Sequence, residues 1–173
     1  MLKTTANKIT VFRIILIPVF LVLAYRGYRI AALCVYLLAC LSDMADGYVA
    51  RHYNQITNFG KFMDPLADKM LVLAAMCFFV DADQMPGWVV AIVLFREFAV
   101  SGLRLIAAEQ SLVIAAAWSG KIKTAVTMVC LALMLVFPVP AVQVVSSILI
   151  VATTIYSGVE YFWKNWSVFQ DID

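Results

Sequence analysis

The amino-acid sequence predicts an all-α integral membrane protein with six transmembrane helices. Of its 173 residues, 64% are apolar and only 14% are charged, and the mean hydropathy is +0.93. Soluble domains have about 45–50% apolar and about 25% charged residues, so the solvent that suits this chain is lipid. A soluble enzyme, a disordered chain and a nucleic-acid-binding protein are therefore excluded. At roughly 20 residues per crossing, the length allows about six helices with short loops.

Six apolar segments follow one another along the chain, and each is predicted to form one membrane-spanning helix. They cover about residues 9–25, 30–50, 62–80, 86–107, 118–137 and 141–162. The breaks between them are short, at residues 25–27, 51–61, 81–87, 109–111 and 138–140. The sequence contains no internal repeat, low-complexity tract or linker, so residues 1–173 are predicted to form a single domain.

The first apolar segment begins with lysines and therefore resembles a secretory signal peptide. However, Arg13 interrupts its apolar run, no small-residue cleavage site follows, and further apolar segments come behind it. We interpret this segment as the first membrane helix.

Lysine and arginine are distributed unequally between the two ends of the predicted helices. Of the thirteen basic residues, only Arg26 and Arg29 lie near one end, which leaves eleven near the other. That other end carries the N-terminus, the loops at 51–61 and 104–121, and the C-terminal tail. The positive-inside rule therefore predicts that both termini are cytoplasmic.

Four aspartates lie where membrane helices rarely carry charge. Asp43 and Asp46 are near the end of the second segment, and Asp64 and Asp68 are near the start of the third. Spacings of three and four residues place each pair on one helix face, and antiparallel segments bring both pairs to the same depth. An ionised carboxylate in a membrane helix costs roughly 2.5–3.5 kcal/mol, so four together require positive charge among them.

The aspartates have two explanations without a catalytic function, namely solvated helix ends and ion pairs with Arg51, Lys61 and Lys69. Solvated ends would not need four acids on matched faces. Oxygen ligands with no histidine or cysteine among them favour hard cations, and four carboxylates balance two divalent ions, Mg²⁺ or Mn²⁺. Two such ions at the membrane surface indicate phosphoryl transfer.

Small residues accompany the aspartates and would let a phosphate approach the helix backbone, while Arg51 offers a planar donor fork. The complete pattern is Asp43-x2-Asp46-Gly47-x2-Ala50-Arg51-x8-Gly60-x3-Asp64-x3-Asp68. At every fixed position it resembles the signature of the CDP-alcohol phosphotransferase family.

This resemblance implies a six-helix membrane enzyme, often a homodimer, that moves a phosphatidyl or related group from a CDP-linked donor to an acceptor hydroxyl and releases CMP. It implies that two divalent cations are bound by Asp43, Asp46, Asp64 and Asp68. It also implies that Asp68 is the general base. The nucleotide site would be lined by Gly47, Ala50, Arg51 and Gly60.

A second group of polar residues in the fourth and fifth segments is expected to select the acceptor. On a helix, Glu97, Ser101 and Arg104 share one face, and Arg96 lies about 100° away. Clustered basic groups at cytoplasmic depth suit an anionic phosphate on the acceptor. The positive-inside bias explains the lysines of the fifth segment equally well, but it explains Arg96 beside Glu97 less well. The residues expected to bind the acceptor's phosphate are Arg96, Ser101, Arg104, Lys121 and Lys123.

The stretches 96–104 and 120–124 resemble the bacterial phosphatidylglycerolphosphate synthases, the branch of the family with CDP-diacylglycerol as donor and glycerol 3-phosphate as acceptor. The opening stretch from Asn7 to Pro18 is similar as well, although Ala6 stands where many members have proline. This resemblance implies that Asn7 and Thr10 contact the nucleotide or the metal region. It further implies a location in the bacterial cytoplasmic membrane, among membrane lipids, with the active site facing the cytoplasm.

Two alternatives remain open from the sequence. One keeps the chemistry but uses another acceptor, such as phosphatidylglycerol in a cardiolipin synthase, or an inositol phosphate. The other is a divalent-cation transporter with the acidic cluster as its translocation site. A transporter has no use for Arg51 or the glycines, and it would move metal without releasing CMP.

Overall fold

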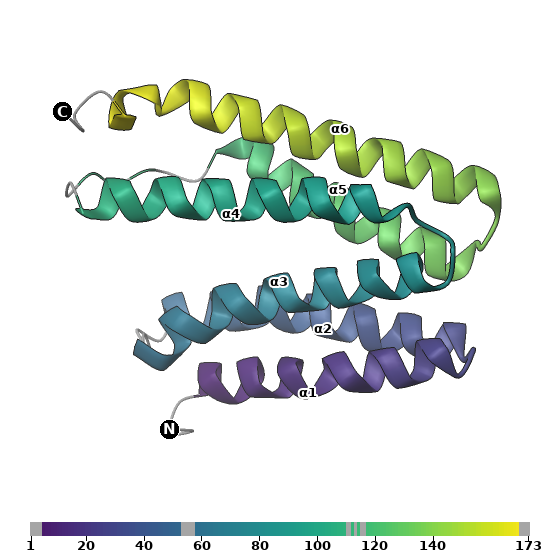
Figure 1. Cartoon of the computed structure of the whole chain (residues 1–173). Helices are drawn as coiled ribbons and strands as arrows, with labels where there is room; N and C mark the ends of the chain where they lie inside the picture. The colour runs from purple at the N-terminus through teal and green to yellow at the C-terminus, as the bar shows by residue number, and fades with distance from the viewer. Residues whose placement is uncertain (1–4, 53–57, 110–111, 113, 115–116, 170–173) are drawn as a thin grey trace.

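The computed structural model is a bundle of six long α-helices that run back and forth (Figure 1). It describes residues 5–52, 58–109, 112, 114 and 117–169. The helices are α1 (Thr5–Tyr25), α2 (Arg29–His52), α3 (Asn58–Asp81), α4 (Gly87–Glu109), α5 (Trp118–Val136) and α6 (Pro140–Lys164), followed by the short 3-10 helix η1 (Trp166–Phe169). These described ranges contain no strand. The predicted all-helical class and its six helical segments are therefore confirmed.

Because six helices run back and forth, the chain starts and ends at the same end of the bundle. Helix α1 packs along α2 and α3, α5 packs along α2 and α6, and α4 packs along α6. The turns after α1, α3 and α5 lie together at the right of Figure 1, whereas both termini and the ends of α2, α4 and α6 lie at the left. We refer to the end with the two termini as the site end.

The turns opposite the site end contain the residues that their geometry demands. Gly27 ends α1 with φ of +79°, a left-handed conformation that glycine adopts without steric penalty. The Tyr28 amide then donates to the Leu23 carbonyl over 3.0 Å, which closes the end of the helix. Pro140 is the first residue of α6, where its missing N–H breaks no helical hydrogen bond. The antiparallel course of the bundle thus follows from local sequence.

The helices extend beyond the apolar segments at the site end. The apolar pattern predicts a break over residues 51–61, but α2 continues to His52 and α3 begins at Asn58. The apolar pattern marks only the part of a helix that needs an apolar surrounding, and a helix continues where its side chains are polar. As a result, every described residue of the motif from Asp43 to Asp68 lies on α2 or α3.

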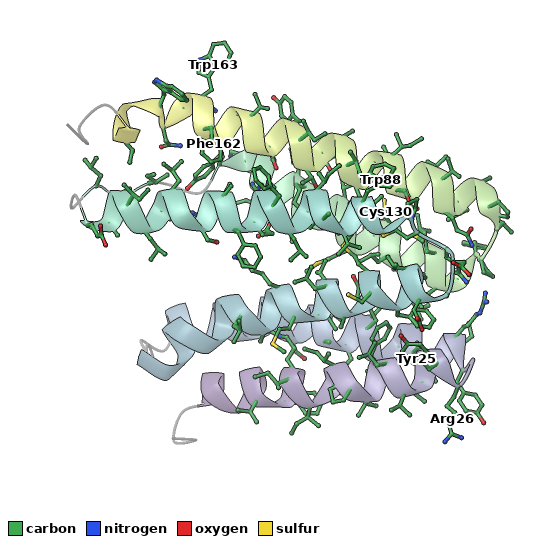
Figure 2. The ribbon with its side chains drawn as sticks, viewed as in Figure 1. Tyr25, Arg26, Trp88, Cys130, Phe162 and Trp163 are labelled. Atoms are coloured by element: carbon green, nitrogen blue, oxygen red, sulfur yellow. The ribbon has the colours of Figure 1, made fainter. Side chains whose placement is uncertain are left out.

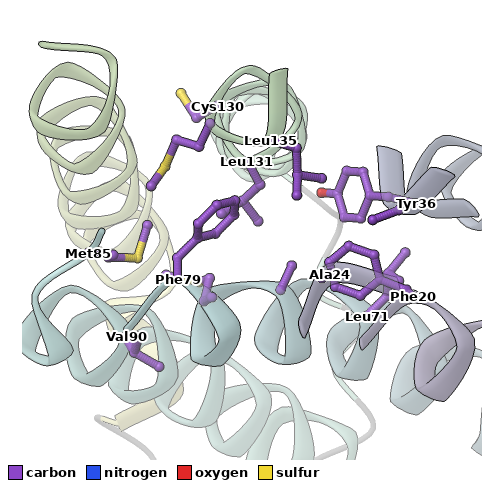
Figure 3. Packing of buried hydrophobic residues seen from close by; sticks show 14 of the residues in the cluster. Phe20, Ala24, Tyr36, Leu71, Phe79, Met85, Val90, Cys130, Leu131 and Leu135 are labelled. Atoms are coloured by element: carbon purple, nitrogen blue, oxygen red, sulfur yellow. The ribbon is translucent and has the colours of Figure 1, made fainter. Parts of the chain in front are cut away.

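The main hydrophobic core lies toward the end of the bundle opposite the site end, and Figure 3 shows part of its packing from close by. Phe20, Tyr36, Phe79 and Leu131 are almost fully buried there and come from α1, α2, α3 and α5. The rings of Phe20 and Tyr36 pack with centroids 5.7 Å apart. A second, smaller cluster joins α4, α6 and η1 near the site end, and it consists of Val100, Leu103, Ala107, Tyr161 and Val168.

The outer surface of the bundle carries large apolar side chains. Phe95, Phe98 and Trp163 are exposed to 77%, 72% and 80%, and Trp163 points away from the bundle in Figure 2. Among the described residues, α5 and α6 are long and apolar enough to cross a membrane. Such a surface is typical of a protein surrounded by lipid. The chain therefore has the character of a membrane protein.

Candidate active site

The predicted metal and nucleotide residues lie on helices that meet at the site end. Asp43 and Asp46 belong to α2 and Asp64 and Asp68 to α3, within about three turns of the ends that face residues 53–57. Their side chains fall outside the described part of the structure, as do those of Asn7, Thr10, Gly47, Ala50, Arg51 and Gly60. The described structure accordingly establishes the helices that carry these residues, and their roles remain predictions.

A cavity of about 720 Å³ borders the two helices that carry the aspartates. On α2 its wall includes Leu41, two residues before Asp43, and on α3 it includes Lys69, the residue after Asp68. The rest of the wall comes mainly from α4 and α5, with Tyr161 from α6. Its polar and charged lining residues are Lys69, Arg96, Glu97, Ser101, Arg104, Lys121, Thr124 and Tyr161.

Four of the five residues predicted to bind the acceptor's phosphate line this cavity. They are Arg96, Ser101, Arg104 and Lys121. The Lys121 ammonium lies 4.9 Å from the centre of the Trp118 ring, a cation–π contact at the start of α5. Lys123 is different, because it is 5% exposed and lines a separate small cavity. The structure thus brings four of the predicted residues together and places Lys123 behind them.

One carboxylate, Glu97, connects three basic residues from three helices. Its Oε1 accepts hydrogen bonds from Lys123 Nζ on α5 over 2.8 Å and from Arg96 Nη1 over 3.0 Å. Its Oε2 lies 3.6 Å from Lys69 Nζ on α3. Buried charges are stable only when they are paired, so Glu97 is what allows Lys123 to be buried and Arg96 to be half-buried.

Lys69 and Glu97 also belong to the site, although neither is among the residues predicted from the sequence to bind a ligand. Lys69 donates a 2.9 Å hydrogen bond to Ser101 Oγ and lines the cavity. The sequence contained a signal for each of them. Lys69 directly follows Asp68, and Glu97 shares a helix face with Ser101 and Arg104. A charged residue at such a position in an apolar helix is functional by default.

The Arg96 side chain occupies a slot between two glycines. A Cβ atom on Gly158 of α6 would lie 3.3 Å from Arg96 Cγ, and one on Gly120 of α5 would lie 3.5 Å from Arg96 Nη2. A larger residue at position 158 would crowd the stem of Arg96, whereas the distance at Gly120 is an ordinary van der Waals contact. Gly158 therefore leaves room for the Arg96 stem, which starts about 100° from the face of Glu97 and still lines the cavity.

Arg104, which also lines the cavity, is held in place by α6. Its Nε donates a 2.8 Å hydrogen bond to the Tyr161 hydroxyl, and its Cζ lies 5.4 Å from the centre of the Tyr161 ring. The ring is 1% exposed, whereas Arg104 is exposed. The two residues are 57 positions apart in the chain, so no local pattern in the sequence predicts this pair.

The arrangement is suited to a small molecule that carries a phosphate. Lys69, Arg96, Arg104 and Lys121 offer positive charge and N–H donors, and Ser101 offers a hydroxyl. Arginine matches the geometry of a phosphate with paired hydrogen bonds, and lysine adds a compact charge. A phosphate bound here lies next to the helices that carry the four aspartates.

Comparisons with known proteins identify the family to which the sequence is similar. A family model described as CDP-alcohol phosphatidyltransferase matches residues 3–157. The chain is 38% identical to a CDP-diacylglycerol–glycerol-3-phosphate 3-phosphatidyltransferase of Bacillus subtilis (strain 168), with 95% of this chain and 96% of the relative covered. It is 36% identical to a probable phosphatidylglycerophosphate synthase of Mycobacterium tuberculosis (strain ATCC 25618 / H37Rv), covering 90% of this chain and 78% of the relative. A further CDP-diacylglycerol–glycerol-3-phosphate 3-phosphatidyltransferase, from Sodalis glossinidius (strain morsitans), is 34% identical, and the match covers 94% of this chain and 89% of the relative.

Proposed function

Because this chain belongs to the CDP-alcohol phosphatidyltransferase family, we propose that it transfers the phosphatidyl group of CDP-diacylglycerol to glycerol 3-phosphate. The products are phosphatidylglycerol phosphate and CMP. The observation that supports an acceptor with a phosphate is the cavity, whose lining includes the basic residues Lys69, Arg96, Arg104 and Lys121. Among acceptors that carry a phosphate, the names of the relatives favour glycerol 3-phosphate. An acceptor with a phosphate of its own needs such a lining, whereas an uncharged alcohol does not.

The acceptor's phosphate is bound by the basic residues, and this orients its hydroxyl toward the aspartates. Arg104 and Lys121 are exposed at the cavity, so they meet the phosphate first. Lys69 and Arg96 line the same cavity and contact Glu97, and Ser101 adds a hydrogen bond. Lys123 acts through Glu97, since its ammonium already donates to that carboxylate. Holding the reactants in this orientation contributes much of the rate of a two-substrate reaction.

The donor is held at the motif of α2 and α3. Asp43, Asp46, Asp64 and Asp68 are all oxygen donors, a set that fits Mg²⁺ or Mn²⁺ and lacks the nitrogen and sulfur ligands of softer metals. When bound, two such ions supply positive charge for the pyrophosphate of the donor. The nucleotide part of the donor is bound by Asn7, Thr10, Gly47, Ala50, Arg51 and Gly60.

Asp68 is the general base of the transfer. It accepts the proton of the acceptor's primary hydroxyl as that oxygen attacks the β-phosphorus of CDP-diacylglycerol. A new P–O bond forms to the acceptor, the P–O bond to CMP breaks, and CMP leaves with the electron pair. Lys69, the next residue, is well placed to meet the acceptor's phosphate, because it lines the cavity and already contacts Ser101.

The placement in the membrane follows from the basic residues at the site end. All six helices cross the bilayer of the bacterial cytoplasmic membrane as one domain, with the site end and both termini in the cytoplasm, according to the positive-inside rule. The acyl chains of the donor then stay in the bilayer while its head group reaches the motif. The active unit is a homodimer, as is common in the family.

The experiment is a panel of acceptors offered to the purified protein in detergent with CDP-diacylglycerol and Mg²⁺. We expect CMP release with glycerol 3-phosphate and little with glycerol, phosphatidylglycerol or inositol phosphate. Faster release with one of the other acceptors would refute the acceptor assignment but keep the chemistry. Metal flux into proteoliposomes without any CMP release would instead support a transporter.

A further inference from the structure

We propose that Tyr161 is a positioning residue for the acceptor, because its hydroxyl fixes the guanidinium of Arg104 at the cavity. This inference rests on the proposed function, since the acceptor's phosphate is the ligand that Arg104 would bind. Tyr161 would not touch the reacting atoms itself. It would act through Arg104 and would determine how well the protein binds the acceptor.

The hydrogen bond to Tyr161 occupies only the Nε–H of Arg104 and leaves its two terminal nitrogens available for a phosphate. Arg104 Nε donates to the Tyr161 hydroxyl over 2.8 Å. A guanidinium has five N–H donors, so the four on its two terminal nitrogens remain for a ligand. Both residues line the cavity, and an exposed arginine without an anchor would sample many rotamers. The bond therefore prepares Arg104 for the paired hydrogen bonds that a phosphate accepts.

The Tyr161 ring is rigid because it is buried against side chains of α4 and η1. It is 1% exposed and belongs to the cluster with Val100 and Leu103 of α4 and Val168 of η1. Its neighbour Phe162 also lies between α6 and α4 in Figure 2. The Tyr161 carbonyl accepts a 2.7 Å hydrogen bond from Asn165 Nδ2, which holds the last turn of α6. A rigid ring thus places one hydroxyl at a defined point of the cavity wall.

A purely structural role for this hydrogen bond makes different predictions. If the bond only joined α4 to α6, its loss would lower stability and would affect both substrates to a similar extent. A positioning role predicts an effect on the acceptor alone, and it predicts that the effect disappears once Arg104 is gone. A double-mutant cycle separates these cases, because two residues that act as a unit are not additive.

The test compares Tyr161→Phe, Arg104→Gln and the double variant, with Tyr156→Phe as the matched control. Tyr156 lies on the same helix and is 67% exposed. We expect Tyr161→Phe to raise KM for glycerol 3-phosphate about fivefold, within the range of about 2- to 12-fold that one hydrogen bond represents. KM for CDP-diacylglycerol should stay unchanged. In the Arg104→Gln background the second substitution should add nothing, and Tyr156→Phe should behave as the unsubstituted protein.

The outcomes distinguish the inference from the function on which it rests. If the unsubstituted protein releases no CMP with glycerol 3-phosphate, both fail. If it does, but Tyr161→Phe keeps the original KM, shifts both substrates equally or adds fully to Arg104→Gln, only the inference is overturned. Should Tyr161→Phe not fold, as judged by thermal unfolding, Arg104→Lys replaces it. Lysine cannot contact the hydroxyl and a phosphate in the same way, so an unchanged KM for that variant would also overturn the inference.

Discussion

Replacing Glu97 by glutamine should destabilise the whole bundle, because this carboxylate is shared by basic groups from three helices. Glutamine keeps the length and shape of the side chain, removes its charge and replaces one acceptor oxygen by an NH₂ donor. Lys123 Nζ at 2.8 Å and Arg96 Nη1 at 3.0 Å would lose their charged partner, and so would Lys69 Nζ at 3.6 Å. The substitution therefore removes all three ion pairs while the volume of the side chain is kept.

The size of the effect follows from the burial of these partners. The side chains of Lys123 and Arg96 are only 6% and 12% exposed, so their charges would be left without compensation. Removing one partner of a buried ion pair costs about 3–5 kcal/mol. Lys69 is 38% exposed and adds little, because water screens it. Glu97 itself retains 19% exposure, and we therefore expect about 3 kcal/mol, the lower end of the range.

The assay is unfolding of the detergent-solubilised protein, followed by tryptophan fluorescence during titration with a denaturing detergent. Glu160→Gln is the matched control, because Glu160 forms an ion pair with Lys164, whose side chain is exposed. That control should hardly change the free energy of unfolding. Adding Lys123→Met to Glu97→Gln should restore part of the stability, since it removes a buried cation without a partner. Equal effects of Glu97→Gln and Glu160→Gln would refute the reasoning.

Three further predictions concern activity. Chelation should abolish CMP release, and Mg²⁺ or Mn²⁺ should restore it; full turnover in excess chelator would exclude the two-metal interpretation. Asp68→Asn should lower the rate by about 10²–10⁴-fold, because the base is lost; a near-normal rate would assign the base elsewhere. Arg104→Gln or Lys121→Gln should raise KM for glycerol 3-phosphate by about 10- to 150-fold, the range for a charge-assisted hydrogen bond. Measuring the KM of both substrates decides this case, since an equal rise of KM for CDP-diacylglycerol would contradict a role in acceptor binding.

Much of the fold and part of the site could be predicted because they depend on residues that are close in sequence. Apolar segments of membrane-spanning length predicted the six helices. The spacing of Asp43, Asp46, Asp64 and Asp68 predicted two helix faces at one end, and α2 and α3 have their adjoining ends there. The shared face of Ser101 and Arg104 follows equally from helical periodicity, and both residues line the cavity.

What the sequence by itself determined is therefore the set of helices and the chemistry that each of them carries. Only the tertiary structure decided which groups meet across helices. It paired Lys123 with Glu97 instead of placing it at the cavity, gave Arg96 a slot beside Gly158, and joined Arg104 to Tyr161. The physical reason is that periodicity defines the faces of one helix, whereas its rotation and depth against a neighbour are set by packing of side chains from the whole bundle.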